Sequence, residues 1–343
     1  MLGTVSHGLI MSNRWRGVLA GGLVVLAFPV SASGAETVRQ GRFEAADPPA
    51  AVAWQARTRQ KLFELMMGGA RPAPVAFDAQ VLARETHAVE GVVLETISLR
   101  TLPDRRVKAW LALPQAREGR VGAVLGLHGH GGTGEQVVRG QGLYWYGRAL
   151  ARLGCVVISP DIGQHELQHP GWSLMGERTW DALRCLDYVA SRPEVDPERL
   201  AVAGLSLGGE TAMYVAALDE RVRLTCSSGW LTTVANMKQG HCPCWNFAGL
   251  EEHFDFADIF ACVAPRGLVL EIGERERAPG GFPVDIARGA FVEIRSAYGV
   301  WGAAGAVEWV VHPGGHVFEG TRFQERLADV FGLKSASPAA AVP

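Results

Sequence analysis

A serine lies between closely spaced glycines in the stretch GLSLG, which contains Gly204, Ser206 and Gly208. The apolar run RLAVAG leads into this stretch, and GGETAMYVAALDE follows it with helical spacing. A strand, a sharp turn and a helix in this order present a serine hydroxyl on a strained backbone, where it can act as a nucleophile. We therefore predict that Ser206 is a catalytic nucleophile.

A serine hydroxyl is a weak nucleophile unless a general base takes its proton, and in this topology the base comes late in the chain. The stretch WVVHPGGHVFEG offers His312 and His316. His316 follows a glycine pair on the loop after the last predicted strand, whereas His312 stands at the end of that strand and is expected to pack or form a turn. We predict His316 as the base.

The third member of such a triad is a carboxylate that orients the imidazole. This carboxylate should follow the predicted strand that comes before the one leading to the histidines, within GLVLEIGERERAPGGFPVD. Glu271 lies within the strand pattern and is the weakest candidate. Glu276 is the first choice because it lies where the loop should turn back toward the histidine, and Glu274 and Asp285 remain alternatives.

Hydrolysis through a serine also needs hydrogen-bond donors for the developing oxyanion. The amide of Leu207, directly after the nucleophile, is one predicted donor. The glycine-rich stretch HGHGGTG, which begins at His128 after the run VLGL, should supply the other. The amide of His130 is the first choice there, and that of Gly131 is the next.

The segment KQGHCPCWNFAGLEEHFDF contains potential metal ligands, namely His241, Cys242, Cys244 and His253. The cysteine spacing is CxC rather than CxxC, and no second cysteine pair completes a zinc motif. We therefore expect no metal and no organic cofactor. A disulfide involving Cys242 or Cys244 remains open.

Three residues of this region are predicted to line a substrate site. His241 and Trp245 lie within the segment, and Trp230 precedes it. Their rings could stack on a sugar, although buried aromatic side chains are equally typical of a packed core.

The surrounding pattern predicts a mostly parallel, doubly wound α/β sheet that begins with an antiparallel hairpin. The hairpin is GVVLETISLRTL with RRVKAWLALPQ, and six apolar runs follow it: VGAVLGLHG, CVVISPD, RLAVAGLS, LTCSSGW, GLVLEIGE and AVEWVVHPG. Helical patterns separate most of these runs, and AVAWQARTRQKLFELMMG predicts a further helix before the hairpin. Such continuous apolar runs suit strands that are buried on both faces.

The expected organisation has one catalytic domain with short flanking segments. Residues 1–35 resemble a signal peptide, because two arginines precede an apolar run and small residues. Residues 36–84 form a tail and a helix, residues 85–333 form the domain, and residues 334–343 form a disordered end. Residues 231–264 lack a strand pattern and should form a cap-like insertion near the active site.

Charge and composition exclude some partners. The 343 residues contain 33 Lys and Arg against 35 Asp and Glu, and 48% are hydrophobic. The net charge of −2 therefore gives no reason to expect nucleic acid or an anionic membrane as a partner. An exported chain would be periplasmic or secreted.

The motifs HGHGG, SPDIGQHE, GLSLGGE, APRGLVLEIGE and GGHVF occur in the order that is typical of the α/β-hydrolase superfamily. The chain resembles the dienelactone-hydrolase-like and acetyl-xylan-esterase-like branch of that superfamily over about residues 85 to 333. The resemblance implies Ser206, Glu276 and His316 as triad, with His130 and Leu207 as oxyanion donors. Two departures stand out: the acid is usually Asp, and true dienelactone hydrolases have cysteine as the nucleophile.

The sequence therefore predicts an exported serine esterase that acts on a carbohydrate-linked ester, either an acetylated sugar or a uronic acid methyl ester. A serine peptidase of the prolyl-oligopeptidase type shares the triad order, but such enzymes normally carry a large N-terminal propeller. A catalytically silent binding protein on the same fold is a third possibility, since fold alone does not establish activity.

Overall fold

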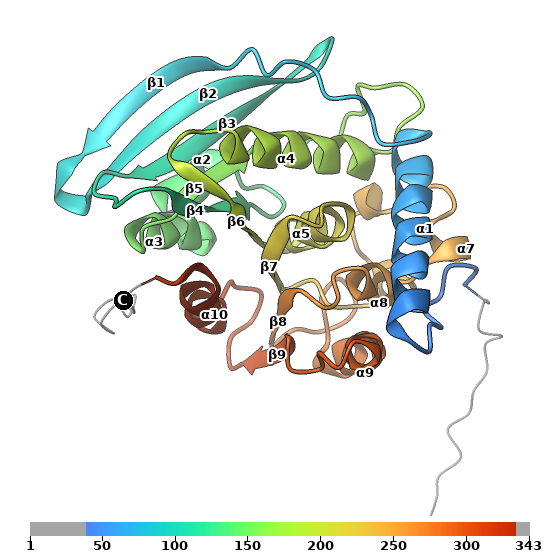
Figure 1. Ribbon diagram of the computed structural model, residues 1–343. Coiled ribbons are helices and arrows are strands. Elements are labelled where there is room, and N and C mark those ends of the chain that lie inside the picture. Colours follow the sequence, from blue (N-terminus) through green and yellow to red (C-terminus); the bar gives the residue numbers. More distant parts are fainter. Residues whose placement is uncertain (1–38, 334–343) are drawn as a thin grey trace, which may run out of the picture. The chain divides into compact units, whose positions relative to one another are not determined.

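A computed structural model describes residues 39–333, and its centre is a nine-stranded sheet (Figure 1). The strand order across the sheet is β1-β2-β3-β5-β4-β6-β7-β8-β9. The strands are β1 (Gln80–His87), β2 (Val92–Leu102), β3 (Arg105–Pro114), β4 (Val121–Leu127), β5 (Val156–Pro160), β6 (Val195–Leu205), β7 (Val222–Ser228), β8 (Gly267–Gly273) and β9 (Val307–His312).

The first three strands pair antiparallel, and β3 also pairs antiparallel with β5. From β5 to β9 every neighbouring pair is parallel. The predicted hairpin followed by a mostly parallel sheet is therefore confirmed. Strand β1 was not predicted, and it begins at Gln80, upstream of the expected domain start at residue 85. Its side chains are almost all exposed, so the strand leaves no apolar alternation in the sequence.

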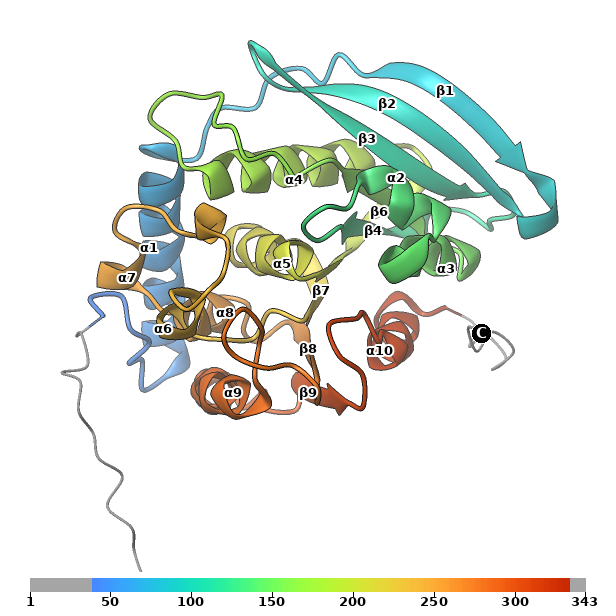
Figure 2. The same cartoon turned by 180° about the vertical axis from the view of Figure 1, so that it is seen from behind.

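Ten α-helices accompany the sheet in the described part of the chain. They are α1 (Pro48–Met67), α2 (Gly134–Arg139), α3 (Tyr146–Arg152), α4 (Leu174–Ala190), α5 (Leu207–Leu218), α6 (Val234–Met237), α7 (Leu250–His253), α8 (Phe256–Ala261), α9 (Val284–Val300) and α10 (Thr321–Phe331). Figure 2 shows the helices from behind, with α2, α3 and α10 grouped apart from α1, α4, α5 and α8.

The helices bury both faces of the parallel strands. Along β4, Leu125 and Leu127 belong to the core beneath α4 and α5, whereas Val124 belongs to the core beneath α2, α3 and α10. Because successive side chains of a strand point to opposite faces, a strand that is covered on both faces needs a continuous apolar run. This is why the apolar runs of the sequence predict these strands well.

Outside the expected insertion at residues 231–264, two helices were not predicted. Helix α2 is short and follows directly on the glycine-rich loop after β4. Helix α9 begins beside Pro283 and contains Gly289 and Gly299, which weaken a helical pattern. Its buried side is made largely of alanines, including Ala287 and Ala290. Packing against α8, rather than intrinsic propensity, therefore explains this helix.

The segment between β7 and β8 contains no strand, as expected. It forms α6, the 3-10 turn η3 (Pro243–Trp245), α7 and α8. The beginning of the predicted tail packs against this segment: the amides of Gln40 and Gly41 donate to the carbonyls of Glu252 and His253 at 3.0 and 2.8 Å. That part of the tail is therefore ordered structure.

The predicted signal peptide and the C-terminal end lie outside the described residues. Within residues 39–333, none of the helices combines the length and the apolar character that a membrane crossing requires.

Candidate active site

Ser206 stands at the sharp turn between β6 and α5. Its backbone has φ 60° and ψ −122°, a region that residues other than glycine rarely adopt. The Ser206 amide donates to the carbonyl of Ser228 on the neighbouring strand, and the Ser206 carbonyl accepts from the amide of Glu210, both at 2.9 Å. These two hydrogen bonds hold the turn in its strained form.

The glycines of GLSLG are required by close backbone packing. A Cβ atom at Gly204 would lie 2.3 Å from the backbone of Gly208, and one at Gly208 would lie 2.1 Å from the carbonyl oxygen of Leu127. The start of α5 therefore packs directly against the ends of β6 and β4. Any larger residue would move the turn that carries Ser206.

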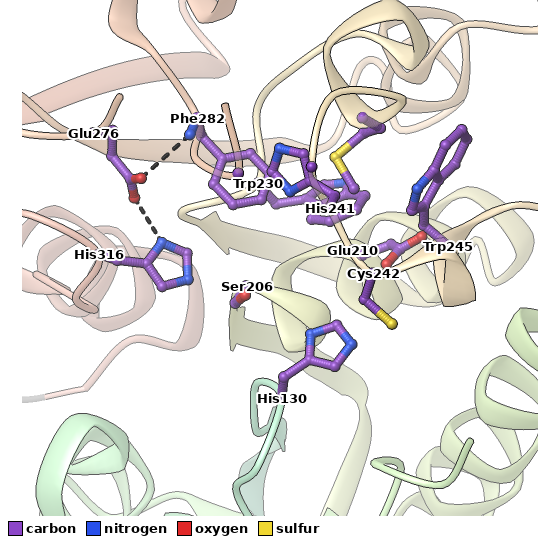
Figure 3. A pocket seen from close by; sticks show the side chains of 13 residues that line it. His130, Ser206, Glu210, Trp230, His241, Cys242, Trp245, Glu276, Phe282 and His316 are labelled. Atoms are coloured by element: carbon purple, nitrogen blue, oxygen red, sulfur yellow. Dashed lines mark hydrogen bonds and ion pairs between the residues drawn. The ribbon is translucent and has the colours of Figure 1, made fainter. Parts of the chain in front are cut away.

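His316 lies on the loop after β9 and forms an ion pair with Glu276 from the loop after β8. The distance from His316 Nδ1 to Glu276 Oε1 is 2.6 Å. The other carboxylate oxygen accepts from the amide of Phe282 at 3.2 Å, and Glu276 is only 6% exposed. The Phe282 ring also stacks on the His316 ring, with centroids 5.5 Å apart and planes at 13°. The imidazole is therefore fixed by the carboxylate and by the aromatic ring (Figure 3).

The other candidates for the acid occupy different environments. The side chains of Glu274 and Asp285 are exposed. Glu271 is buried within β8 and accepts from the amides of Glu319 and Gly320 at 3.2 and 2.9 Å. Burial raises the pKa of Glu271 to about 7. Of the four carboxylates considered, the structure brings only Glu276 to His316.

His312 is nearly buried at the end of β9. Its Nδ1 accepts a hydrogen bond from the amide of Gly314 at 3.2 Å, so this histidine shapes the turn that precedes His316. Burial lowers the pKa of His312. The turn-forming position agrees with the expectation for this residue.

Ser206 and His316 line the same pocket without a direct hydrogen bond between them. Figure 3 shows the ring of His316 between the carboxylate of Glu276 and Ser206. Hydrogen bonds between nucleophile and base are often long or absent before substrate binds.

The loop after β4 lies against Ser206. A Cβ atom at Gly129 would lie 3.0 Å from the Leu205 carbonyl oxygen and 3.1 Å from Ser206 Cβ, so the loop approaches Ser206 as closely as glycine permits. The buried ring of His128 accepts from the amide of Ile162 at 3.0 Å through Nε2 and thereby anchors the loop to the one after β5. The predicted oxyanion donor His130 follows directly on this anchored segment.

The amide of Leu207 is the second predicted donor. Leu207 is the first residue of α5, and the first amides of a helix have no acceptor within it. Leu207 thus follows Ser206 directly in the chain, and the loop that contains His130 packs against Ser206 at Gly129.

A cavity of about 360 Å³ opens over Ser206. The three residues predicted for substrate binding all line it, although Trp230 and Trp245 are only 2% and 4% exposed. Both tryptophans pack on Phe256, and His241 packs on Phe282. These aromatic residues therefore form a rigid wall, and little of either tryptophan surface is available to a ligand. The cavity is lined by His130, Ser206, Glu210, Trp230, Met237, Gly240, His241, Cys242, Trp245, Glu276, Gly280, Phe282 and His316.

Glu210 and Phe282 are among the lining residues that were not predicted. Glu210 is fully buried, and neither of its carboxylate oxygens has a hydrogen-bond partner. Burial raises the pKa of Glu210 to about 8, so the group is largely protonated at neutral pH. Its spacing from Ser206 could have revealed it, because residues four apart on a helix share a face. The sequence around Phe282 contains no comparable pattern that could have identified it as a lining residue.

The four potential metal ligands of the segment KQGHCPCWNFAGLEEHFDF do not lie together in the structure. His253 lies on α7 beside the N-terminal segment, and the ring of His241 packs on Phe282. Cys242 and Cys244 instead lie beside His165 and His130, which come from other loops. All six cysteines are unpaired in the structure.

Comparisons with known proteins agree with this architecture. Residues 75–233 match the family model for acetyl xylan esterase. The Bacillus subtilis (strain 168) protein YtaP, which is named as a hydrolase, is 27% identical over 289 residues, covering 76% of this chain and 94% of YtaP.

Two solved structures share the fold. A Bacteroides fragilis NCTC 9343 protein described as an acetyl xylan esterase has a TM-score of 0.70 at 18% identity, over 86% of this chain and 92% of its own. A glucuronoyl esterase from Solibacter usitatus has a TM-score of 0.66 at 16% identity, over 86% of this chain and 96% of its own.

The sheet order, the turn at Ser206 and these matches place the chain in the α/β-hydrolase superfamily. Within that superfamily it resembles the acetyl-xylan-esterase-like branch, whose family model matches residues 75–233. The findings support a carboxylic ester hydrolase.

Proposed function

We propose that the protein is a serine esterase in which Ser206, His316 and Glu276 form the catalytic triad and the ester is linked to a carbohydrate. The observation that carries the proposal is the 2.6 Å contact between His316 Nδ1 and the buried Glu276, in the pocket that holds the strained Ser206. This contact fixes the imidazole with Nδ1 as donor, so that Nε2 is free to accept a proton.

In the acylation half of the reaction, Ser206 Oγ attacks the ester carbonyl carbon and His316 Nε2 takes the hydroxyl proton. The carbonyl oxygen becomes an oxyanion that accepts hydrogen bonds from the amides of Leu207 and His130. The carbonyl then re-forms, the bond to the alcohol oxygen breaks, and His316 returns its proton to the leaving alcohol. The acyl group remains on Ser206.

Deacylation repeats these steps with water. His316 takes a proton from a water molecule as the water oxygen attacks the acyl carbon. The same amides stabilise the second oxyanion. Its collapse breaks the bond to Ser206 Oγ, and His316 returns the proton to the serine. Glu276 remains ionised throughout and stabilises the imidazolium that forms in each half.

The pocket favours an uncharged, compact ester group. Neither lysine nor arginine occurs among the described residues that line it, whereas the carboxylate of Glu276 does line it. A cavity of about 360 Å³ holds an acyl group and little more than one sugar ring. We therefore favour an acetyl group on a sugar over the methyl ester of a uronic acid, whose polymer neighbours carry negative charges.

Export to the periplasm or the exterior is part of the same proposal, because polymeric carbohydrate is found outside the cell. The support is the pattern of arginines, apolar run and small residues within residues 1–35. A fusion of these residues to a reporter that is active only outside the cytoplasm would test the export step.

The rate on four substrates tests the proposed activity: p-nitrophenyl acetate, acetylated xylan, methyl-esterified pectin and a prolyl peptide. We expect activity on the two acetyl esters and a loss on the order of 10³-fold or more in Ser206→Ala. Preference for the pectin ester would shift the substrate to uronic acid esters. Activity on the peptide alone would indicate a peptidase, and no activity on any substrate would indicate a silent binding protein.

A further inference from the structure

Four side chains that can bind a metal meet at the rim of the pocket. They are His130, His165, Cys242 and Cys244, and their ligand atoms all lie within 4.8 Å of one another. His130 Nε2 is 3.0 Å from Cys244 Sγ, and His165 Nε2 is 3.5 Å from Cys242 Sγ. The two imidazole rings face each other with centroids 5.6 Å apart. Nothing in the proposed ester chemistry uses this arrangement of thiols and imidazoles.

The spacing is close to that of a tetrahedral zinc site. Bonds of about 2.3 Å to sulfur and 2.0–2.1 Å to nitrogen place the ligand atoms of a regular tetrahedron roughly 3.3–3.8 Å apart. The two measured contacts are 3.0 and 3.5 Å, and the largest separation in the cluster is at most 4.8 Å. Shifts of about 1 Å in the ligand atoms, which side-chain rotations can supply, would therefore produce tetrahedral coordination. Two thiolates with two imidazoles are a ligand set that selects zinc.

The charges around the cluster are compatible with such an ion. Arg178 and Glu210 are both fully buried, and the Arg178 guanidinium lies close enough for its charge to act on Cys244 and Glu210, while it donates hydrogen bonds to Met175 Sδ and to the carbonyl oxygen of Gln164. Two thiolates neutralise a divalent cation, so a neutral metal centre could lie beside this arginine. Cys244 is buried, whereas the other three ligands are exposed, which leaves a route for a metal to enter.

The four ligands come from three loops that are far apart in the sequence. His130 belongs to the loop after β4, His165 to the loop between β5 and α4, and the cysteines to the segment between β7 and β8. We propose that these residues form a structural zinc site that ties the three loops together at the rim of the pocket. Four protein ligands fill the tetrahedron, so the ion has no open position for substrate.

Two protons leave the cysteine thiols when the ion binds, and both imidazoles bind as neutral rings. The site also restrains the backbone of His130. On the proposed function, whose oxyanion donors include the amide of this residue, the bound ion would help to hold the donor beside Ser206.

Metal content and cobalt spectroscopy test the site without measuring activity. The purified chain is stripped with a chelator under reducing conditions and then loaded with Zn²⁺ or Co²⁺. We expect about one ion per chain and a thiolate-to-cobalt charge-transfer band with the strong visible bands of a tetrahedral centre. Zinc should also raise the melting temperature by roughly 5 °C or more, because it binds only the folded chain.

Variants identify the ligands. His165→Ala and Cys242→Ser should each lower zinc affinity by at least about tenfold, since even the loss of a residue that supports a ligand costs that much. His253→Ala is the matched control, because it removes a histidine of the same region that lies outside the cluster. It should bind zinc like the unaltered chain. Circular dichroism of each variant shows whether it folds, which separates a loss of zinc binding from a loss of folding. Because His165 and Cys242 lie on different loops, one variant still tests the site if the other does not fold.

Several results would overturn the site. One is a reloaded chain that holds well under one zinc ion per chain. Others are a cobalt spectrum without the charge-transfer band, and a zinc affinity that is unchanged in His165→Ala and Cys242→Ser. A non-reduced mass two hydrogens lower, with the loss mapped to the peptide containing Cys242 and Cys244, would show a disulfide in place of the metal. Ser206→Ala should load zinc normally, so a failed esterase assignment and a failed metal site give different results.

Discussion

At the scale of single residues, the proposed chemistry depends on one carboxylate being buried and its neighbours being exposed. Glu276 has a hydrogen bond to each oxygen, one from His316 and one from the amide of Phe282. Glu274 belongs to the same loop, but its side chain is exposed. The fixed position of Glu276, rather than its residue type, therefore makes it suitable for orienting the imidazole.

Glu276→Gln should lower kcat for p-nitrophenyl acetate on the order of 10²-fold or more. The amide cannot stabilise an imidazolium, and its NH₂ group can force the imidazole into the wrong tautomer. The matched substitution Glu274→Gln should leave kcat within about twofold, because exposed side chains away from the site contribute little. Equal losses in the two variants would contradict the assignment of the acid.

Glu210→Gln is expected to keep most of the activity at pH 6.5. The pKa of Glu210 is about 8, so the carboxyl is already neutral at that pH and glutamine replaces it with a neutral group of similar shape. We expect kcat/KM within about fivefold of the unaltered chain in steady-state assays. A loss of 10²-fold or more would show that an ionised Glu210, or its proton, takes part in the reaction.

At the scale of elements, the turn at Ser206 depends on contacts between backbones. The start of α5 lies against the end of β4, and no side chain fits between them. The strain at Ser206 is thus maintained by strands and a helix that are themselves buried in the core.

Gly208→Ala should destabilise the fold strongly. The new Cβ would lie 2.1 Å from the carbonyl oxygen of Leu127, so α5 or β4 must shift. We expect a loss of about 3 kcal/mol or more in the free energy of unfolding, measured with urea. Gly289→Ala in α9 is the control: nothing lies within 4 Å of its Cβ position, and alanine favours the helix by roughly 0.5–1 kcal/mol. Similar destabilisation by both substitutions would contradict the packing argument.

The sequence predicts most elements because the strands of the parallel sheet are covered on both faces and so appear as apolar runs. It does not reveal β1, whose side chains are exposed, or α9, whose buried side consists mainly of small residues. Ser206 and His316 could be predicted from their motif and order along the chain. The choice among Glu274, Glu276 and Asp285 depends on the path of one loop, which local pattern does not determine. His165 could not be joined to Cys242, because only the folded loops bring the two together.

At the scale of the whole molecule, buried carboxyl groups make stability depend on pH. Glu271 is buried in β8 near Cys226 and Glu319, and it accepts from the amides of Glu319 and Gly320. Burial raises its pKa from 4.5 to about 7. Between these values the folded chain holds the proton and the unfolded chain releases it, so the contribution of Glu271 to stability falls as pH rises through this window.

Glu271→Gln should remove this dependence. The free energy of unfolding of the unaltered chain, relative to that of the variant, should fall by roughly 3 kcal/mol between pH 4.5 and 7.5. Urea unfolding of both proteins at several pH values measures the difference, which cancels the titration of all other groups. A difference that is constant with pH, or that grows in favour of the unaltered chain, would contradict the raised pKa.

On the proposed function, the strained Ser206 is activated by His316, and covalent labelling tests this activation most directly. A fluorophosphonate should react with the unaltered chain, and mass spectrometry should locate the adduct on Ser206. Ser206→Ala should not be labelled, and His316→Ala should be labelled at least about 10²-fold more slowly. Labelling that persists in Ser206→Ala, or an unaltered chain that does not react, would contradict the account.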